Sequence, residues 1–584
     1  MAREQSIIDE LKRRRVLRVV LVYTASAFAV LQGAQLIVTQ LGLPSWILTA
    51  LLVIALLGVP AAAVLAWLFD ITPEGVQRAR HEAGTHRWLS PRAAAVIAVA
   101  FIATASMAWY AGRVGARSTN IEDAKRSIAV LPFANLSDRA GDVAFSDGLA
   151  DELLNLLGRI NGLKVAARTS AFVFRDRTND IRAIGDSLGV QTVLEGSVRR
   201  AGPRVRVTAT LINVADGMRM WSHQYDDDLT NIFQVQERLA RAIASQLELR
   251  LGDAVASRSA VDVEALDLYL AGLDRFRQRG ESVRVAIDYF ERAIAVDPTY
   301  AEAYGGLAMA YAVLPGWDTV STQWAAERTR YAAQRAIDLD DRLPEPYAAL
   351  CQSLALSEWK WAEAQEACNA AIRRNGSFAI AHAWLGELLA IVGRFGESRI
   401  AFDRALMLDG YSGVVHQMAG VAAVSERDLP RGSALLERSV ELGLESSRLV
   451  AAAAAIFQND EARARDLLAP IVPAGRLDMF LEAARNSEVR AAVAEAADAN
   501  VDRRWPNWAV ENARTFAFIG DAERTLKYLQ LAFDRHEFTL ASQLHSPFFD
   551  FLRGDARFQS MVRAMGLDPD AAIRANEMQL RTSD

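Results

Sequence analysis

The run Ala93-Ala-Ala-Val-Ile-Ala-Val-Ala-Phe-Ile-Ala-Thr-Ala-Ser-Met-Ala-Trp-Tyr-Ala111 divides the chain into two unequal parts. Its 19 residues carry no charge, and a helix of this length can cross the hydrocarbon layer of a membrane. No apolar run of this length occurs between Arg113 and the last residue, Asp584. The sequence therefore predicts an N-terminal membrane anchor followed by a large part outside the bilayer.

Two similar apolar runs come before it. We expect three transmembrane helices at about 19–38, 46–69 and 93–111, which make residues 1–112 a membrane anchor in contact with the lipid bilayer. Six basic residues precede the first helix and none separates the first from the second. Three lie in the loop between the second and the third, and Arg92 stands at the start of the third. Because Lys and Arg favour the cytoplasmic side, we expect a cytoplasmic N-terminus. Three crossings would place the rest of the chain outside, so in a Gram-negative cell we expect a multi-pass protein of the bacterial inner membrane with periplasmic domains.

The first expected transmembrane helix carries small residues at every fourth position. Ala25, Ala29 and Gly33 lie on one helix face, a spacing that lets helices approach closely. This face serves either packing among the three helices of one chain or formation of a homodimer, and the sequence leaves both open.

Composition excludes some classes of function. The chain has 65 Lys and Arg against 71 Asp and Glu, so its net charge is −6. This balance argues against a general nucleic-acid binder. Two cysteines are too few for a disulfide framework.

After a polar tether at 113–126, the pattern changes to that of a small α/β domain at 127–251. We expect helices at 145–160, at 181–188 and from about 231 to 251. We expect strands at 127–133, 163–167, 190–199, 204–212 and 219–225. The last three strands predict an antiparallel meander with helices on one side.

Several short motifs follow one another in this segment. They are Val130-Leu-Pro-Phe133, Asn135-Leu-Ser137, Phe145-Ser-Asp-Gly148, Leu194-Glu-Gly-Ser197, Trp221-Ser-His-Gln-Tyr225 and Phe233-Gln-Val-Gln236. Together they resemble the TolB amino-terminal-like domain, which is related to FlgO. The resemblance implies a small α/β domain of bacterial envelope or signalling proteins without established catalysis. In such proteins a nucleotide-cyclase domain often precedes it; here three apolar runs take that place.

From residue 265 onward the sequence is helical and repetitive. Tyr347, His382 and His416 occupy equivalent positions that are 35 and 34 residues apart, which is the tetratricopeptide (TPR) period. The preceding step, from Tyr304, is longer, so we expect an insertion at 315–323. The resemblance to TPR repeats covers about 265–444. Degenerate helical repeats and a C-terminal cap are expected at 445–567, and a tail at 568–584.

The inner face of the first helix in each repeat is the best candidate for a partner-binding groove. The repeat spacing assigns to it Glu302, Met309, Glu345, Ala348, Gln352, Ala383, Glu387 and Gln417. This set contains no Lys or Arg. It would favour a protein segment with apolar and basic side chains, the alternative being a face that is merely solvated.

Cys351 and Cys368 lie on the two expected helices of one repeat, where the helices face each other. A disulfide is geometrically allowed and the periplasm would permit it. Two buried thiols are the alternative, and both remain open.

No sequence pattern points to catalysis. We find no phosphate-binding loop, metal-ligand cluster or nucleophile elbow, and the seven histidines are scattered. We therefore expect no catalytic residues, no metal, no cofactor and no enzymatic activity. Residues 135–142 offer a weak phosphate candidate at a helix start. The run Asp226-Asp-Asp228 is either a cation site or a solvated turn.

The expected architecture joins three transmembrane helices, an α/β domain and an all-α TPR superhelix. It suggests a membrane-anchored periplasmic scaffold that binds protein partners. The alternative is a sensor in which the α/β domain binds a ligand and signals through the membrane to a cytoplasmic effector.

Overall fold

The computed structural model describes residues 126–137, 142–175, 180–247, 262–499 and 506–572, together with 23, 27, 69–72, 75–78, 249, 501 and 574. Nearly all of the three expected transmembrane helices lies outside the described residues, as do Ala25, Ala29, Gly33 and the tether. Among the residues that are described, no helix combines the length and apolar character needed to span a bilayer. The chain divides into two compact units, residues 1–123 and 124–584.

The first unit contains one described hairpin. Strand β1 (Phe69–Thr72) pairs antiparallel with β2 (Gly75–Arg78), with Phe69 opposite Arg78 and Thr72 opposite Gly75.

The second unit begins with a mixed six-stranded sheet of order β5-β3-β6-β7-β8, in which β4 pairs with the far end of β6. Its strands are β3 (Ser127–Val130), β4 (Ala134–Asn135), β5 (Lys164–Val165), β6 (Thr192–Ala201), β7 (Arg204–Asn213) and β8 (Arg219–Asp228). Parallel pairs join β3 to β5 and to β6, whereas β6, β7 and β8 form the expected antiparallel meander.

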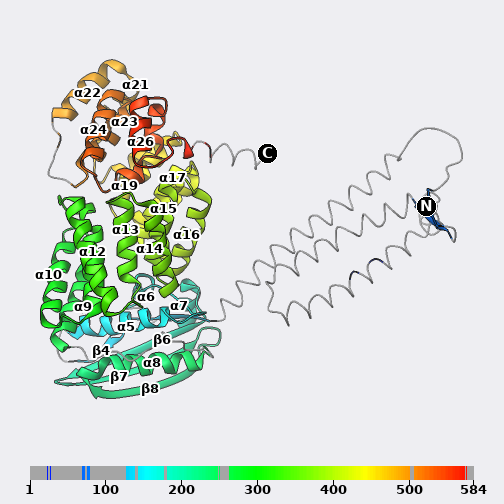
Figure 1. Ribbon diagram of the computed structural model, residues 1–584, viewed down its shortest axis with the longest axis vertical. Helices are drawn as coiled ribbons and strands as arrows, with labels where there is room; N and C mark the ends of the chain where they lie inside the picture. The colour runs from blue at the N-terminus through cyan, green and yellow to red at the C-terminus, as the bar shows by residue number, and fades with distance from the viewer. Residues whose placement is uncertain are drawn as a thin grey trace. The chain divides into compact units, whose positions relative to one another are not determined.

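Helices cover both faces of this sheet (Figure 1). They are α5 (Asp142–Gly158), α6 (Arg168–Phe172), α7 (Ile181–Leu188) and α8 (Ile232–Gln246). The buried side chains of α5 and α8 share a cluster with Ile128 and Val130 of β3. Those of α6 and α7 share a cluster with Ala129, which faces the other side of the sheet. The expectation of helices on one side is therefore wrong. The central strand β3 is fully buried on both faces, so both need cover.

The remainder of the unit is a series of antiparallel helix pairs. The TPR-like pairs are α9 (Val263–Gln278) with α10 (Ser282–Val296), α11 (Ala301–Val313) with α12 (Thr322–Leu339), α13 (Glu345–Leu356) with α14 (Trp361–Arg374), α15 (Ala379–Ile391) with α16 (Phe395–Leu408), and α17 (Gly413–Ser425) with α18 (Leu429–Glu441). The expected insertion contains the short 3₁₀ helix η3 (Leu314–Gly316) and a loop that leads into α12. Helices α13, α15 and α17 begin 34 residues apart.

Further helices follow the repeats. They are α19 (Ser447–Phe457), α20 (Glu461–Leu468), α21 (Ala474–Arg485), α22 (Ser487–Ala499), α23 (Trp508–Ile519), α24 (Ala522–Asp534), α25 (Leu540–Gln543), η4 (Pro547–Leu552) and α26 (Ala556–Ala564). The segment from Phe538 onward shares a core with Leu356, Leu388 and Ile391 of α13 and α15. The Trp361 indole N–H also donates to the Met565 carbonyl at 2.8 Å. The C-terminal part thus folds back on the middle repeats, where a cap on the last pair was expected.

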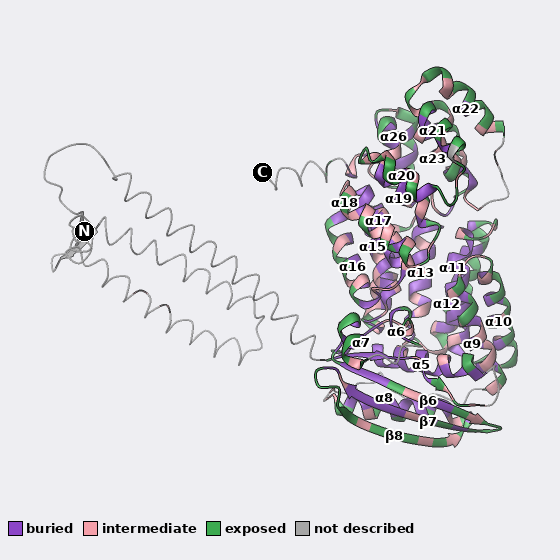
Figure 2. Cartoon of the chain, turned by 180° about the vertical axis from the view of Figure 1, so that it is seen from behind, coloured by how far each residue is buried: buried purple, intermediate pink, exposed green. Residues whose placement is uncertain are grey.

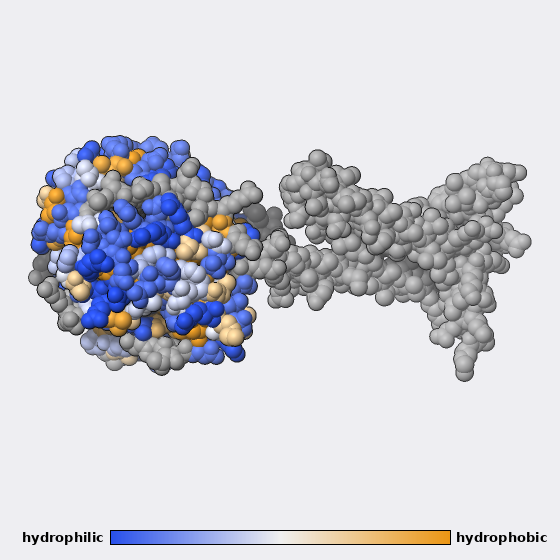
Figure 3. All heavy atoms as spheres, turned by 90° about the horizontal axis from the view of Figure 1, so that it is seen from below, coloured by the Kyte–Doolittle hydropathy of each residue, from blue (hydrophilic) through white to orange (hydrophobic). Residues whose placement is uncertain are grey.

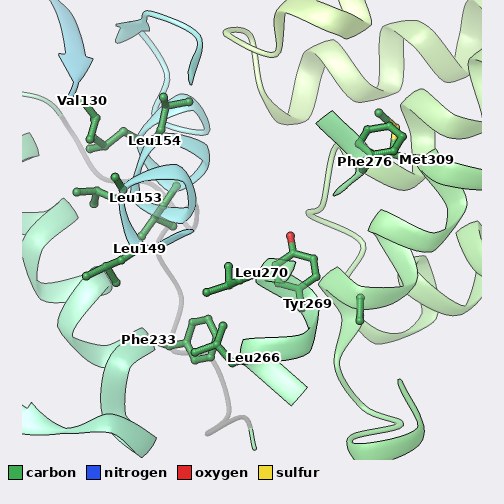
Figure 4. Packing of buried hydrophobic residues seen from close by; sticks show 14 of the residues in the cluster. Val130, Leu149, Leu153, Leu154, Phe233, Leu266, Tyr269, Leu270, Phe276 and Met309 are labelled. Carbon is green, nitrogen blue, oxygen red and sulfur yellow. The ribbon is translucent and has the colours of Figure 1, made fainter. Parts of the chain in front are cut away.

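The α/β domain and the repeats share one continuous core, which runs from Ile128 to Trp384. Leu270 of α9 points toward α5, where an added Cβ at Gly148 would lie 2.4 Å from its Cδ2 atom (Figure 4). Buried hydrogen bonds continue this contact along the loops between repeats. Ser377 Oγ accepts from the Val165 N–H at 3.1 Å, and Ser170 Oγ donates to Asp409 Oδ1 at 2.7 Å.

Candidate functional site

Three of the eight predicted groove residues come together in one pocket. Gln352 of α13, Glu387 of α15 and Gln417 of α17 line a cavity of about 410 Å³. Its wall is otherwise mainly apolar and includes Leu356, Ile380, Trp384, Ile391, Met418, Val421, Leu449 and Phe538. A concave, mostly apolar pocket with a few polar groups is the usual form of a binding site.

The other five predicted residues lie outside this pocket. Met309, Ala348 and Ala383 are buried and do not line the pocket, so the expectation that they face a groove is wrong. Helix α13 packs between α11 and α15, and these positions are taken up by helix–helix contacts. Glu302 and Glu345 are partly exposed.

The C-terminal fold-back forms one side of the pocket. Phe538, Thr539, Ser542 and His545 belong to its lining. The His545 ring donates from Nε2 to the Ile391 carbonyl at 2.9 Å, and the Arg427 guanidinium donates to the His545 carbonyl at 2.7 Å. The C-terminal segment therefore occupies part of the space along the inner face of the repeats. No periodic pattern in the sequence marks this contact, and the prediction of a long groove missed it.

Glu387 is the acidic group of the pocket. Its Oε2 accepts one hydrogen bond, from Gln352 Nε2 at 3.3 Å. Burial raises the pKa of the Glu387 carboxyl to about 7, and the Gln352 hydrogen bond opposes this shift. No basic side chain in the described part of the chain contributes to this balance. The carboxyl is thus poised between its neutral and charged forms near neutral pH.

Two arginines also reach the wall, which corrects the expectation of a lining without Lys or Arg. Arg514 pairs with Glu511 at 3.1 Å. The Arg279 guanidinium lies 4.5 Å from the centre of the Phe276 ring, and burial lowers the pKa of this group to about 10. Both arginines come from loops or helices outside the predicted set.

The remaining candidates from the sequence have structural partners. Asp226 accepts from Arg206 Nε at 2.8 Å, and Asp227 accepts from the Asn231 amide at 2.9 Å and pairs with Arg238. These contacts argue against a cation site, and the three aspartates end strand β8, where a solvated turn was the expected alternative. The Asn135 side chain accepts from the Ser137 N–H at 2.9 Å, while residues 138–141 lie outside the described set. Within the described residues, no group of three or more His, Cys, Asp or Glu is arranged for a metal.

Cys351 and Cys368 form a disulfide that joins α13 to α14, with Cα atoms 5.0 Å apart. Both residues are fully buried. The bridge lies in the same repeat as Gln352 and so restrains the helix that carries one wall of the pocket.

Comparison with known proteins gives partial matches. No family model matches the chain. A protein of Rhizobium meliloti (strain 1021) named putative adenylate cyclase 3 is 35% identical over 241 residues, which is 40% of each chain. The chain therefore spans well under half of that relative's length.

Among solved structures, a thermophilic TPR protein of Thermus thermophilus is 18% identical over 33% of this chain and 99% of its own, with a TM-score of 0.29. PilF of Pseudomonas aeruginosa is 16% identical over 36% and 93%, with a TM-score of 0.28. Human IFIT1, solved as a dimer with PPP-AAAA, is 14% identical over 60% and 78%, with a TM-score of 0.34. The TPR-like architecture itself is visible in the paired helices and their 34-residue step.

Proposed function

We propose that this protein is a membrane-anchored scaffold that binds a protein partner, and that the pocket around Glu387 receives an apolar side chain and a basic side chain of that partner. The observation that carries this proposal is a carboxyl in a largely apolar wall whose raised pKa is not offset by either arginine of that wall. An incoming Lys or Arg would supply the missing positive charge.

The two parts of the pocket have separate roles in this proposal. The aromatic and aliphatic wall gains about 25 cal/mol for each Å² of apolar surface removed from water, which supplies affinity. A cation close to Glu387 stabilises the charged carboxylate and lowers its pKa, which supplies selectivity for basic over neutral or acidic segments. Gln352 and Gln417 add hydrogen-bonding groups to the lining.

The membrane anchor and the periplasmic location belong to the same proposal. They rest on the three apolar runs and on the distribution of Lys and Arg around them. Anchoring confines the binding surface to a thin layer and raises the local concentration of any partner in that layer. The resemblance of 127–251 to the TolB amino-terminal-like domain supports an envelope role.

Binding rather than catalysis is part of the proposal. The partial relative named putative adenylate cyclase 3 suggests an obvious assay. We expect the purified full chain, given ATP with Mg²⁺ or Mn²⁺, to produce no cyclic AMP above a heat-inactivated control. Sustained formation of cyclic AMP would contradict this part of the proposal.

A sensor is the second candidate, and the shared core of the α/β domain and the repeats favours it. A conformational change caused by a ligand on either part would reach the other part through the hydrogen bond between Ser170 and Asp409 and the contacts beside it. Deletion of residues 2–11 separates the two functions. A scaffold keeps its partners after this deletion, whereas a transducer that needs a cytoplasmic contact loses its output.

Partner capture tests the proposed pocket. Full-length chain in detergent is used as bait, and the recovered proteins are quantified for wild type, Glu387→Lys and Glu366→Lys. Glu366 is an exposed residue of α14, so its substitution makes the same charge change away from the pocket. We expect at least a tenfold loss of the partner with Glu387→Lys and none with Glu366→Lys. Equal recovery with both variants would exclude the pocket as the binding site.

A further inference from the structure

Strand β8 is a long strand at the edge of the sheet. It pairs with β7 along its length, and no other described strand pairs with its outer side. None of its ten residues is buried, in contrast to the fully buried β3 (Figure 2). An edge strand presents a row of unpaired backbone N–H and C=O groups, which natural proteins either block or use for association.

The charges of β8 are separated along the strand. Arg219 begins it, Asp226, Asp227 and Asp228 end it, and the residues between carry no acidic or permanently basic side chain. An antiparallel copy of the same strand would place the positive start of each beside the negative end of the other. A parallel copy would place like charges together, which is unfavourable.

We infer that β8 pairs antiparallel with β8 of a second copy of this chain, so that two sheets join into one across a twofold axis. This association is separate from the partner pocket. It also differs from a dimer through the first transmembrane helix, because it uses the sheet of the second unit.

The side chains select one register. Opposed residues in an antiparallel pair lie on the same face, so a twofold axis can pass through His223 or through Gln224. With His223 on the axis, Trp221 lies opposite the second copy's Tyr225. With Gln224 on the axis, Trp221 lies opposite the second copy's Asp227. The first register pairs aromatic rings instead of placing a ring against a carboxylate, so it is the favoured one. Arg219 lies beyond the bulge, at the end of the strand that approaches the acidic end of the second copy.

An aromatic row already marks this face of β8. The ring centres of Trp221 and His223 are 6.0 Å apart, and those of His223 and Tyr225 are 4.7 Å apart. The favoured register would continue this row into the second copy. Seen from below, the described surface is mostly hydrophilic with separate apolar spots, so backbone pairing rather than a broad apolar patch has to drive the contact (Figure 3).

Other features of the strand limit which partners it accepts. The register shifts between Leu211 and Ile212, which leaves a bulge near the start of β8. Asp226 and Asp227 are held by Arg206 and Arg238. A bulge and fixed charges are devices that prevent indiscriminate edge pairing. A partner strand must therefore bring complementary charges in the right order, as a second copy does.

Cysteine cross-linking of the full chain in detergent tests this inference. The two native cysteines are bonded to each other, so an introduced cysteine is the one free thiol. Residues on the twofold axis face their own copies at about 4.5–5.5 Å, which a disulfide can span. We expect His223→Cys to give a disulfide-linked dimer under mild oxidation.

Met218→Cys is the matched control. Met218 is 68% exposed in the same hairpin. In the inferred dimer its two copies are ten residues apart along the strand, or about 33 Å, so we expect no cross-link. Equal cross-linking at both positions, or none at His223→Cys, would overturn the inference. A wild-type dimer by light scattering without a cross-link at 223 would also overturn it and direct attention to another interface.

A charge variant gives an independent measurement. Arg219 has no ion pair among the described residues, so Arg219→Asp should leave the monomer folded. We expect light scattering to show the monomer mass for Arg219→Asp at a protein concentration where wild type is dimeric. A dimer of unchanged affinity would contradict the antiparallel pairing of oppositely charged strand ends.

Discussion

The buried carboxyl of Glu387 makes the stability of the folded chain depend on pH. Burial raises its pKa to about 7 from an ordinary value of 4.5. The folded chain therefore keeps this proton at pH values where the unfolded chain has lost it. The stabilisation is fully present below about pH 4.5 and is lost as the pH rises through about 7. We expect wild type to lose more stability between pH 5 and pH 8 than Glu387→Gln does, as measured by urea unfolding.

Glu366→Gln is the control for this comparison, because it removes an exposed carboxyl from the preceding repeat. Its stability should follow the wild-type pH dependence. If Glu387→Gln also follows it, the carboxyl of Glu387 does not carry a raised pKa in the folded chain.

At the scale of residues, the repeat spacing identified part of the pocket. Gln352 and Glu387 were found because they occupy the same offset from Tyr347 and His382. Met309 and Ala383 were assigned by the same rule, yet neighbouring helices bury them. Phe538 and His545 could not be predicted, because they reach the pocket through a fold-back more than 100 residues away in sequence.

At the scale of elements, several helix pairs place a glycine against a large side chain. An added Cβ at Gly386 of α15 would lie 2.8 Å from the Phe402 ring of α16. We expect Gly386→Ala to lower the free energy of unfolding by about 1–3 kcal/mol, because the core has no room for the methyl group.

Gly396→Ala serves as the matched control, since nothing lies within 4 Å of a Cβ built there. Its effect should be small or slightly stabilising, at most about 1 kcal/mol, because alanine favours a helix. Equal destabilisation by both substitutions in thermal or urea unfolding would show that helix packing at Gly386 is not the cause.

The helices themselves were largely predictable from sequence. Their apolar period and the step from Tyr347 to His382 to His416 predicted α13, α15 and α17. The meander was predictable from the strict alternation in 204–212. The position of α7 on the opposite face of the sheet was not predictable, because amphipathic spacing shows that a helix has a buried face but not which surface it covers.

At the scale of the whole molecule, residues 124–584 form one unit rather than two linked domains. Ser377 and Asp409 stand in loops between repeats, and both bond to the α/β domain. Such contacts join positions more than 200 residues apart and leave no local pattern in the sequence. The strand and helix patterns predicted an α/β domain, and the repeat period predicted TPR-like helix pairs. Neither predicted the interface between the domain and the repeats.

The central claim is that the pocket and the sheet work in the periplasm, held there by a membrane anchor. Reporter fusions at Asn120 and Arg80 test it most directly. We expect an active periplasmic reporter at Asn120 and a silent one at Arg80. An active cytoplasmic reporter at Asn120 would contradict it and would place the pocket, the Cys351–Cys368 bridge and strand β8 in the cytoplasm.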